Sequence, residues 1–389
     1  TQSRSSAASD VYKRQSIYMS QHHSIIIVGA GAAGIGMAIT LQDFNLSDVL
    51  ILEKNSIGHS FKQWPKSTRT ITPSFTTNGF GMPDINAVSI DTSPAFTFKE
   101  EHLSGSTYGE YLELISQHYQ LNVETKTTVN SIEAKKDCYY IKTNHGDYSA
   151  DYLFIATGDF DFPYQPFQYG RHYSKIHDFN TLGQDNKRYT IIGGNESAFD
   201  AAIHLSNVGA QVSIYAQQSS FNQVDADPSI RLSSYTYHRL KSAMSNGAQI
   251  DMHTPYTLAS ISYDNDIYTL TFTNGLITQS ETEPIIATGF DVRANPLVQQ
   301  LFDINGQDIK LTDQDESTRY PNVFMIGATV RHDNATLCYI YKFRARFAVL
   351  AKIIADREGL SDNQNIVDRY KHNQMYLDDY ECCDVNCSC

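Results

Sequence analysis

Three glycines stand at a spacing that can bring the backbone against a phosphate group. Gly29, Gly31 and Gly34 follow the apolar run 24–28 and precede a helix-like stretch that reaches Leu41. In such a strand, turn and helix, the first glycine permits a tight turn, the second admits a pyrophosphate close to the backbone, and the third lets the helix pack on the strand. Free N–H groups and the helix dipole then favour a negative charge. We therefore expect a pyrophosphate site at this turn.

An acid follows at the distance that a dinucleotide site requires. A second apolar run, 49–52, ends on Glu53, about 20 residues beyond the glycines, where a carboxylate accepts hydrogen bonds from a ribose hydroxyl. A lone glycine turn occurs in many α/β proteins. The strand, the helix and the acid together predict a dinucleotide-binding unit.

A second turn of the same kind begins at Gly193 and follows another short apolar run. Its pattern puts Asn195 in the place of the middle glycine, Ser197 within the turn and Ala198 as the small packing residue. Asparagine suits this place because it tolerates the left-handed backbone better than most residues. The strand 211–215 ends without an acid for a ribose 2′-hydroxyl, which favours NADPH over NADH, although no arginine follows either. The alternative is a degenerate turn retained only for structure.

The elements around the two turns repeat in the same order. Each turn is followed by a helix, a strand, three short strands and an Ala-Thr-Gly triplet, which closes on Gly158 in the first block and on Gly289 in the second. The short strands are expected at 129–133, 139–142 and 148–155 in the first block, and at 259–263, 267–273 and 277–286 in the second. This duplication predicts an α/β fold with tandem Rossmann-type domains, each with a β-meander. A further strand then runs into Gly327, and a long helix is expected over 335–357.

The composition excludes several classes of protein. The net charge of −13 disfavours nucleic-acid binding, which depends on Lys and Arg. No run approaches the roughly 18 apolar residues of a membrane-spanning helix, so we expect no membrane partner. Only two of the six cysteines lie outside the last eight residues, which fits a reducing cytoplasm better than a disulfide framework. Residues 1–21 are expected to be a disordered leader because their first eighteen residues lack an apolar segment.

These motifs resemble those of the two-dinucleotide flavoproteins, and among them the flavin-containing monooxygenases with their bacterial CzcO-like relatives. The resemblance covers about residues 22–355 and is carried by both glycine turns, Glu53, the segment 58–64, both Ala-Thr-Gly triplets and Gly327. It implies FAD at the first turn, NADPH at the second, and Gly327 close to the flavin. Within 58–64, Trp64 covers the flavin or packs in the core.

The same resemblance suggests one catalytic residue. Residues 74–78 resemble the family's S-x-x-T-N segment, which implies that the side-chain amide of Asn78 faces the flavin. A donor placed there would stabilise negative charge that develops on bound oxygen. An alternative is a loop asparagine that caps a turn.

Other side chains also leave alternatives open. The segment 167–172 departs from the monooxygenase fingerprint because its glycine and histidine are wrongly spaced. His172, which closes this segment, orients the nicotinamide or a linker, or is a surface hydrogen-bonding residue. Arg344 and Arg346 meet cofactor phosphates or lie on a solvated helix face.

The chain is expected to divide into an FAD-binding domain, 22–165 with 284–360, and an inserted NAD(P)H-binding domain, 166–283. The remainder, 361–389, is expected to be a Cys-rich tail. Four cysteines that suit soft metals or thiol exchange lie in it: Cys382, Cys383, Cys387 and Cys389. No individual residue is assigned as a metal ligand.

The resemblance implies an NADPH-dependent monooxygenase that transfers one atom of molecular oxygen to a small-molecule substrate through a flavin hydroperoxide. A first alternative is a disulfide or metal-ion reductase, which is weakened by the lack of a cysteine pair near the expected flavin. A second alternative is a flavin-binding metal sensor without catalysis. The oligomeric state is open, and a homodimer is one option.

Overall fold

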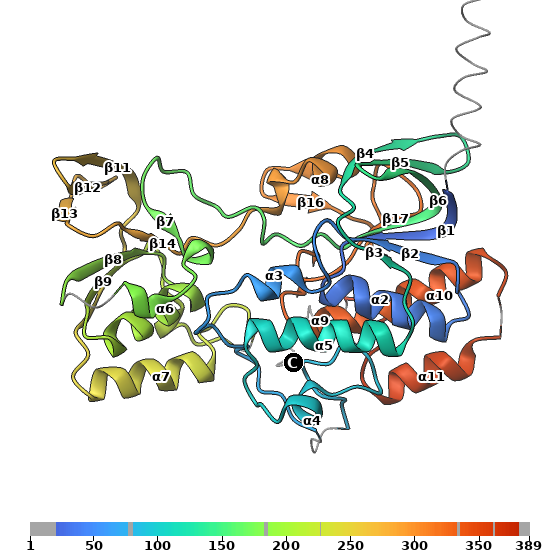
Figure 1. Ribbon diagram of the computed structural model, residues 1–389, viewed down its shortest axis with the longest axis horizontal. Helices are drawn as coiled ribbons and strands as arrows, with labels where there is room; N and C mark the ends of the chain where they lie inside the picture. Colours follow the sequence, from blue (N-terminus) through green and yellow to red (C-terminus); the bar gives the residue numbers. More distant parts are fainter. Residues whose placement is uncertain are drawn as a thin grey trace, which may run out of the picture.

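A computed structural model of the chain describes residues 21–76, 81–182, 186–225, 227–332, 335–360 and 362–380. Two α/β bodies lie side by side, one around a seven-stranded sheet and one around a five-stranded sheet (Figure 1). Across the described residues, every helix is too short or too polar to cross a membrane.

The larger sheet is built from both local and distant strands. Its order is β3-β2-β1-β6-β5-β4, and β17 pairs with β6. The strands are β1 (Gln21–Val28), β2 (Val49–Leu52), β3 (Val123–Glu124), β4 (Val129–Ala134), β5 (Tyr139–Thr143), β6 (Gly146–Ile155) and β17 (Val323–Met325). The pairs β3–β2, β2–β1, β1–β6 and β6–β17 are parallel, whereas β4, β5 and β6 form an antiparallel meander. The apolar runs at 24–28 and 49–52 are central parallel strands, which are buried on both faces.

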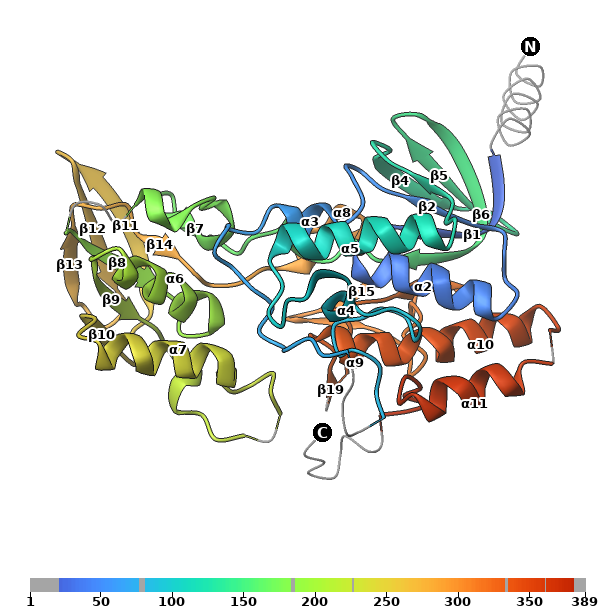
Figure 2. The ribbon, with the colours of Figure 1, turned by 60° about the horizontal axis from the view of Figure 1, so that its bottom comes forward.

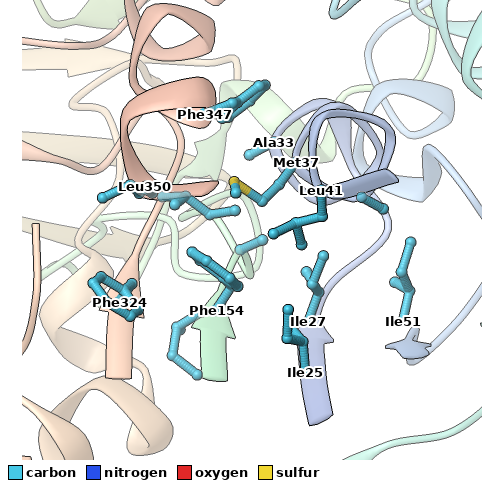
Figure 3. Close-up of a cluster of buried hydrophobic side chains, with 14 of the residues drawn as sticks. Ile25, Ile27, Ala33, Met37, Leu41, Ile51, Phe154, Phe324, Phe347 and Leu350 are labelled. Atoms are coloured by element: carbon cyan, nitrogen blue, oxygen red, sulfur yellow. The ribbon is translucent and has the colours of Figure 1, made fainter. Parts of the chain in front are cut away.

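Helices cover one face of this sheet. Helix α2 (Ala32–Asp43) and helix α10 (Phe347–Arg357) lie against it, α5 (Gly105–His118) flanks α2, and α11 (Gln364–His372) flanks α10 (Figures 1 and 2). Helix α2 is apolar around most of its circumference because it is enclosed by the sheet and by α10. Figure 3 shows this core, in which Met37 and Leu41 of α2 lie over the strands and Leu350 of α10 lies beside Met37.

The smaller sheet has the order β10-β9-β8-β14-β7, and it is parallel throughout. Its strands are β7 (Arg171–His172), β8 (Arg188–Ile192), β9 (Gln211–Tyr215), β10 (Ile250–His253) and β14 (Ile285–Ile286). Helix α6 (Glu196–Asn207) packs on it, and α7 (Ser234–Ser245) packs on α6. A separate antiparallel meander joins β11 (Leu258–Asp264), β12 (Ile267–Phe272) and β13 (Ile277–Ser280). The predicted α/β fold with two Rossmann-type units and two meanders is therefore confirmed.

Short elements complete the chain. The remaining helices are α3 (His59–Lys62), α4 (Pro94–Phe98), α8 (Pro296–Leu301) and α9 (Ile340–Phe343). Two small strand pairs are β15 (Asp303–Asn305) with β16 (Asp308–Lys310), and β18 (Arg331–His332) with β19 (Ala335–Thr336). Single 3₁₀ turns occur at Tyr173–Lys175, Phe179–Thr181, Ser220–Asn222, Val292–Ala294 and Arg344–Arg346.

Several predicted boundaries are wrong. The continuous helix over 335–357 is replaced by β19, an extended residue at Tyr339, α9, a 3₁₀ turn and α10. The strand expected over 277–286 is split into β13 and β14, which join different sheets. Gln21, assigned to the leader, belongs to β1, and the segment assigned to the tail contains the packed helix α11, whose Val367 and Tyr370 are buried. The remaining domain limits stay a prediction.

Candidate functional site

The first glycine turn has the geometry that its sequence predicts. Gly29 has a φ of +110°, and a Cβ atom there would lie 2.5 Å from the carbonyl oxygen of Ala156. A Cβ on Gly34 would lie 1.9 Å from the carbonyl oxygen of Gly29, so helix and strand can only pack this closely without a side chain. Gly31 caps α2, and a Cβ there would meet no atom beyond its chain neighbours within 4 Å. The middle position is therefore open for a ligand.

Glu53 is fixed to this turn by two backbone hydrogen bonds. Its Oε2 accepts from the N–H of Ala30, and its Oε1 accepts from the N–H of Asn55, at 2.9 and 2.7 Å. The side chain is buried but lines the same cavity as Gly31. Each carboxylate oxygen keeps a lone pair that a ribose hydroxyl can use.

A cavity of about 670 Å³ brings the predicted residues together. Its wall contains six of them: Gly29, Gly31, Glu53, Trp64, Gly158 and Gly327. A volume of roughly 300 to 1,000 Å³ is usual for a small-molecule or cofactor site. The open backbone at Gly31, the N-terminus of α2 and the held carboxylate suit a pyrophosphate and a ribose, so the residues present fit FAD.

Aromatic side chains form much of the remaining wall. Trp64 is half-buried and packs on Phe61 with ring centroids 5.1 Å apart, so it is both a wall residue and a packing residue. Phe160 and Phe290, which follow the two Ala-Thr-Gly triplets, stack at 5.6 Å where the chain crosses between the bodies. These rings make the part of the cavity wall that they form apolar.

Two carboxylates follow the first triplet. Burial raises the pKa of the Asp159 carboxyl, and the positive charge of Arg331 opposes that rise. Asp161 pairs with Lys54, with Oδ2 and Nζ 2.6 Å apart. Lys54 is the only lysine or arginine among the described residues of the cavity wall, and this pair neutralises it.

The second glycine turn repeats the first almost bond for bond. The N–H of Gly29 donates to the carbonyl of Leu52 at 2.9 Å, and that of Gly193 donates to the carbonyl of Tyr215 at 3.0 Å. Gly193 has a φ of +136°, and a Cβ there would lie 2.2 Å from the carbonyl oxygen of Ala287. This correspondence aligns Leu52 with Tyr215. It therefore puts Ala216 where the first unit has its acid, which agrees with the sequence argument for NADPH.

The other predicted residues of the second turn lie around the start of α6. Asn195 is exposed and caps this helix with a φ of −120°, so the left-handed backbone that we expected for it is wrong. Ser197 is half-buried, and Ala198 is fully buried, as a packing residue should be. Gly289 has a φ of +81°, and a Cβ there would meet no atom beyond its chain neighbours within 4 Å. The turn fits a pyrophosphate at the N-terminus of α6.

His172 is buried, which excludes the surface role considered for it. Its Nδ1 accepts from the N–H of Ser174, so its Nε2 carries the proton and donates to the carbonyl of Gly289 at 2.9 Å. Burial lowers the pKa of His172. This side chain therefore holds the connection between the two bodies in place.

Both arginines considered for cofactor phosphates are also buried. Arg344 donates to the backbone carbonyls of Asp84 and Ala87, and Arg346 pairs with Asp315 at 2.7 Å. Neither a phosphate role nor a solvated helix face is correct. Both residues belong to the 3₁₀ turn between α9 and α10, all of which is buried.

One asparagine and one cysteine complete the comparison of the structure with the sequence predictions. Asn78 lies outside the described residues, so its role stays a prediction. Cys338 is exposed in the cavity wall, and its Sγ donates to Ser229 Oγ at 3.0 Å. The sequence offered no signal for Cys338, because no second cysteine stands at a redox spacing from it. No three His, Cys, Asp or Glu side chains of the described part of the chain cluster as a metal site.

This fold and site define a two-dinucleotide oxidoreductase. A family model for pyridine nucleotide-disulphide oxidoreductases matches residues 26–327. The chain therefore belongs to this family, which with its relatives implies FAD and NADPH as cofactors and makes the protein an NAD(P)H-dependent flavoenzyme.

Individual relatives include both oxygenases and reductases. A CzcO-like oxidoreductase of Geobacillus kaustophilus is 25% identical over 190 residues, which are 49% of this chain and 50% of the relative. Senecionine N-oxygenase of Tyria jacobaeae is 24% identical, with 52% and 49% covered, so the chain spans about half the length of these two relatives. Bacilliredoxin reductase Bdr of Bacillus subtilis is 23% identical, with 86% and 98% covered.

Solved structures show the same fold. Bacillithiol disulfide reductase from Staphylococcus aureus has a TM-score of 0.67 at 21% identity, and a flavin-containing monooxygenase from Stenotrophomonas maltophilia has 0.66 at 14%. Each comparison covers 87% of this chain and 99% of the other. The predicted resemblance to CzcO-like and monooxygenase-like flavoproteins is confirmed.

Proposed function

We propose that this protein is an NADPH-dependent flavin monooxygenase for a small molecule. The reaction consumes NADPH, a proton, oxygen and substrate, and it yields NADP⁺, water and the oxygenated product. FAD supplies hydride acceptance and oxygen activation when bound. The observation that carries the proposal is the cavity wall, which is rich in aromatic rings and contains one thiol among its described residues.

The residues of the chain bind and orient rather than react. The backbone at Gly31 and the start of α2 hold the pyrophosphate of FAD, while Glu53 accepts from a ribose hydroxyl. The turn from Gly193 to Ala198 holds the pyrophosphate of NADPH. Phe61, Trp64 and the other aromatic side chains exclude water, which suppresses unproductive loss of oxygen as hydrogen peroxide.

Asn78 is the proposed donor to bound oxygen. Ser74, which begins the same S-x-x-T-N segment, is buried and donates to Asp84 Oδ1 at 2.6 Å, so the start of the segment is fixed. Thr72, two residues earlier, lines the cavity. The fixed position of Ser74 and the place of Thr72 in the cavity wall support the role proposed for Asn78.

A disulfide reductase is the second candidate, and Cys338 is the observation that favours it. An exposed thiol in the cavity wall could exchange with an external disulfide, which would be reduced to two thiols at the expense of one NADPH. The alignment with bacilliredoxin reductase, which covers 86% of this chain and 98% of the relative at 23% identity, supports this candidate as well. The second described cysteine, Cys138, does not line the cavity, so a thiol pair cannot be assembled from the described residues.

Steady-state oxidation of NADPH with different acceptors separates the two functions. We expect turnover with oxygen, little release of hydrogen peroxide once a substrate is found, and no acceleration by disulfides. The variant Cys338→Ser should behave like the wild type. Disulfide-dependent turnover that Cys338→Ser abolishes would instead establish the reductase.

A further inference from the structure

A stack of three side chains joins the two bodies of the molecule. The His102 ring lies parallel to the Tyr235 ring, with centroids 3.8 Å apart and an interplanar angle of 15°. The Arg239 guanidinium lies over the same tyrosine ring, 4.7 Å from its centroid. Aromatic stacking and cation–π contact both stabilise such an arrangement. His102 precedes α5 beside the large sheet, whereas Tyr235 and Arg239 belong to α7 beside the small one.

On the side of the large sheet, the stack ends in the cavity wall. His102 Nδ1 lies 2.6 Å from the carbonyl oxygen of Thr70, to which it donates. Thr70 Oγ1 accepts from the N–H of Leu103 at 3.0 Å, and the N–H of Thr70 donates to the carbonyl of Leu103. Thr70 and Ile71 line the cavity. The position of His102 therefore fixes part of the wall where FAD fits.

On the side of the small sheet, the stack ends at the second glycine turn. Ser233, which caps α7 two residues before Tyr235, donates its N–H to the carboxylate of Glu196. Glu196 is the first residue of α6, directly after Asn195. A second connection runs from Arg239 to Asp200 of α6, with nitrogen and oxygen 2.9 Å apart.

The Asp200 end of this connection is buried and has several partners. Burial raises the pKa of Asp200, but the hydrogen bond and charge of His204 and the charge of Arg239 outweigh it, so the pKa is lowered. Tyr173 also donates to Asp200, at 2.6 Å, and its hydroxyl lies 2.5 Å from Thr68 of the first body. A charge with this many partners holds its neighbours in one arrangement.

From these contacts we infer that Tyr235 is a positioning residue for hydride transfer, because its ring fixes the NADPH turn relative to the flavin cavity. The inference uses only the reduction of FAD by NADPH, which monooxygenase and reductase share. It therefore stands or falls independently of the proposed function. Hydride transfer is sensitive to such positioning, since a 1 Å misplacement can cost ~100-fold in rate.

Anaerobic stopped-flow reduction of the FAD-loaded enzyme by NADPH tests this inference. Tyr235→Ala should lower the limiting rate of flavin reduction by ~10- to 100-fold, while the Kd for NADPH changes by less than about 3-fold. Tyr235→Phe keeps the ring and should reduce at the wild-type rate. His102→Leu, which removes the stacked partner from the other body, should match Tyr235→Ala, and the double variant should be no slower than either single variant.

A second readout does not depend on bound cofactor. In the apo protein, proteolytic cleavage of the crossing segments 159–165 and 287–295 should be about 2- to 10-fold faster in Tyr235→Ala than in wild type, and unchanged in Tyr235→Phe. Wild-type reduction and cleavage rates in both Tyr235→Ala and His102→Leu would overturn the inference. So would an equal loss of reduction rate in Tyr235→Phe, because the phenol hydroxyl rather than the stack would then be responsible.

Discussion

The carboxylate of Glu53 accepts a hydrogen bond from the backbone N–H of Ala30, which lies between Gly29 and Gly31, with the two atoms 2.9 Å apart. The acid predicted to bind a ribose therefore also braces the turn predicted to bind the pyrophosphate. One side chain thus connects the two predicted parts of the site.

Replacing this acid by its amide should weaken FAD binding. Both oxygens of Glu53 accept from backbone N–H groups, so the NH₂ group of Glu53→Gln must face a donor. That mismatch destabilises the turn with or without ligand, whereas the Kd responds to the lost hydrogen bond between the ribose hydroxyl and a charged carboxylate. Such a bond contributes about 1.5 to 3 kcal/mol, which corresponds to a ~10- to 150-fold rise in the Kd for FAD. Flavin-fluorescence titration of the apo protein measures this Kd. The surface variant Glu133→Gln should leave it unchanged, and equal Kd values for the two variants would contradict the assignment.

Two glycines of the same turn should respond differently to substitution. Gly31→Val adds a side chain whose Cβ meets no atom beyond its chain neighbours within 4 Å, so the protein should fold normally but lose most of its FAD. Gly34→Ala drives a Cβ atom to 1.9 Å from the carbonyl oxygen of Gly29, so it should cost at least about 3 kcal/mol of folding free energy. Thermal denaturation and the FAD-to-protein absorbance ratio measure the two effects. Full FAD content in Gly31→Val would show that this turn is not the flavin site.

Position 216, which corresponds to Glu53 of the first unit, holds an alanine instead of an acid. This difference predicts a preference for NADPH over NADH. We expect kcat/KM for NADPH to exceed that for NADH by ~10-fold or more, about 1.4 kcal/mol. Ala216→Glu restores the acid that Glu53 provides in the first unit and should move this ratio toward NADH, because the carboxylate repels a 2′-phosphate. A tenfold preference of the wild type for NADH would overturn the prediction.

The burial of His172 predicts that the folded protein loses stability as the pH falls. Because burial lowers its folded pKa, the unfolded chain binds the proton more tightly. The stability that neutral His172 contributes is complete above the unfolded pKa of about 6.5 and is lost as the pH falls through the folded pKa. Urea unfolding at neutral and mildly acidic pH should therefore show a smaller acid-induced loss in His172→Gln than in wild type. Identical losses would mean that His172 is not protonated differently in the two states.

Local patterns were enough to predict the two dinucleotide units. The turns at Gly29 and Gly193 depend on close contacts with their own strands and helices, so their spacing is visible in the chain. By contrast, Arg344 bonds to carbonyls some 260 positions earlier, and its burial has no local signature. The same holds for His172 with Gly289, and for Cys338, which reaches the cavity only through the break in the expected helix. Tertiary contacts of this kind override propensity and patterning.

The reaction of the reduced enzyme with oxygen tests the proposed monooxygenase most directly. The enzyme is reduced with one equivalent of NADPH, so that NADP⁺ remains bound, and is then mixed with oxygen in a stopped-flow spectrophotometer. We predict that flavin reoxidation occurs in two resolved phases and that Asn78→Ala accelerates the second phase. Both proteins release one hydrogen peroxide per flavin, because no substrate is present to take up oxygen. A single-phase reoxidation of the wild type would contradict the proposal.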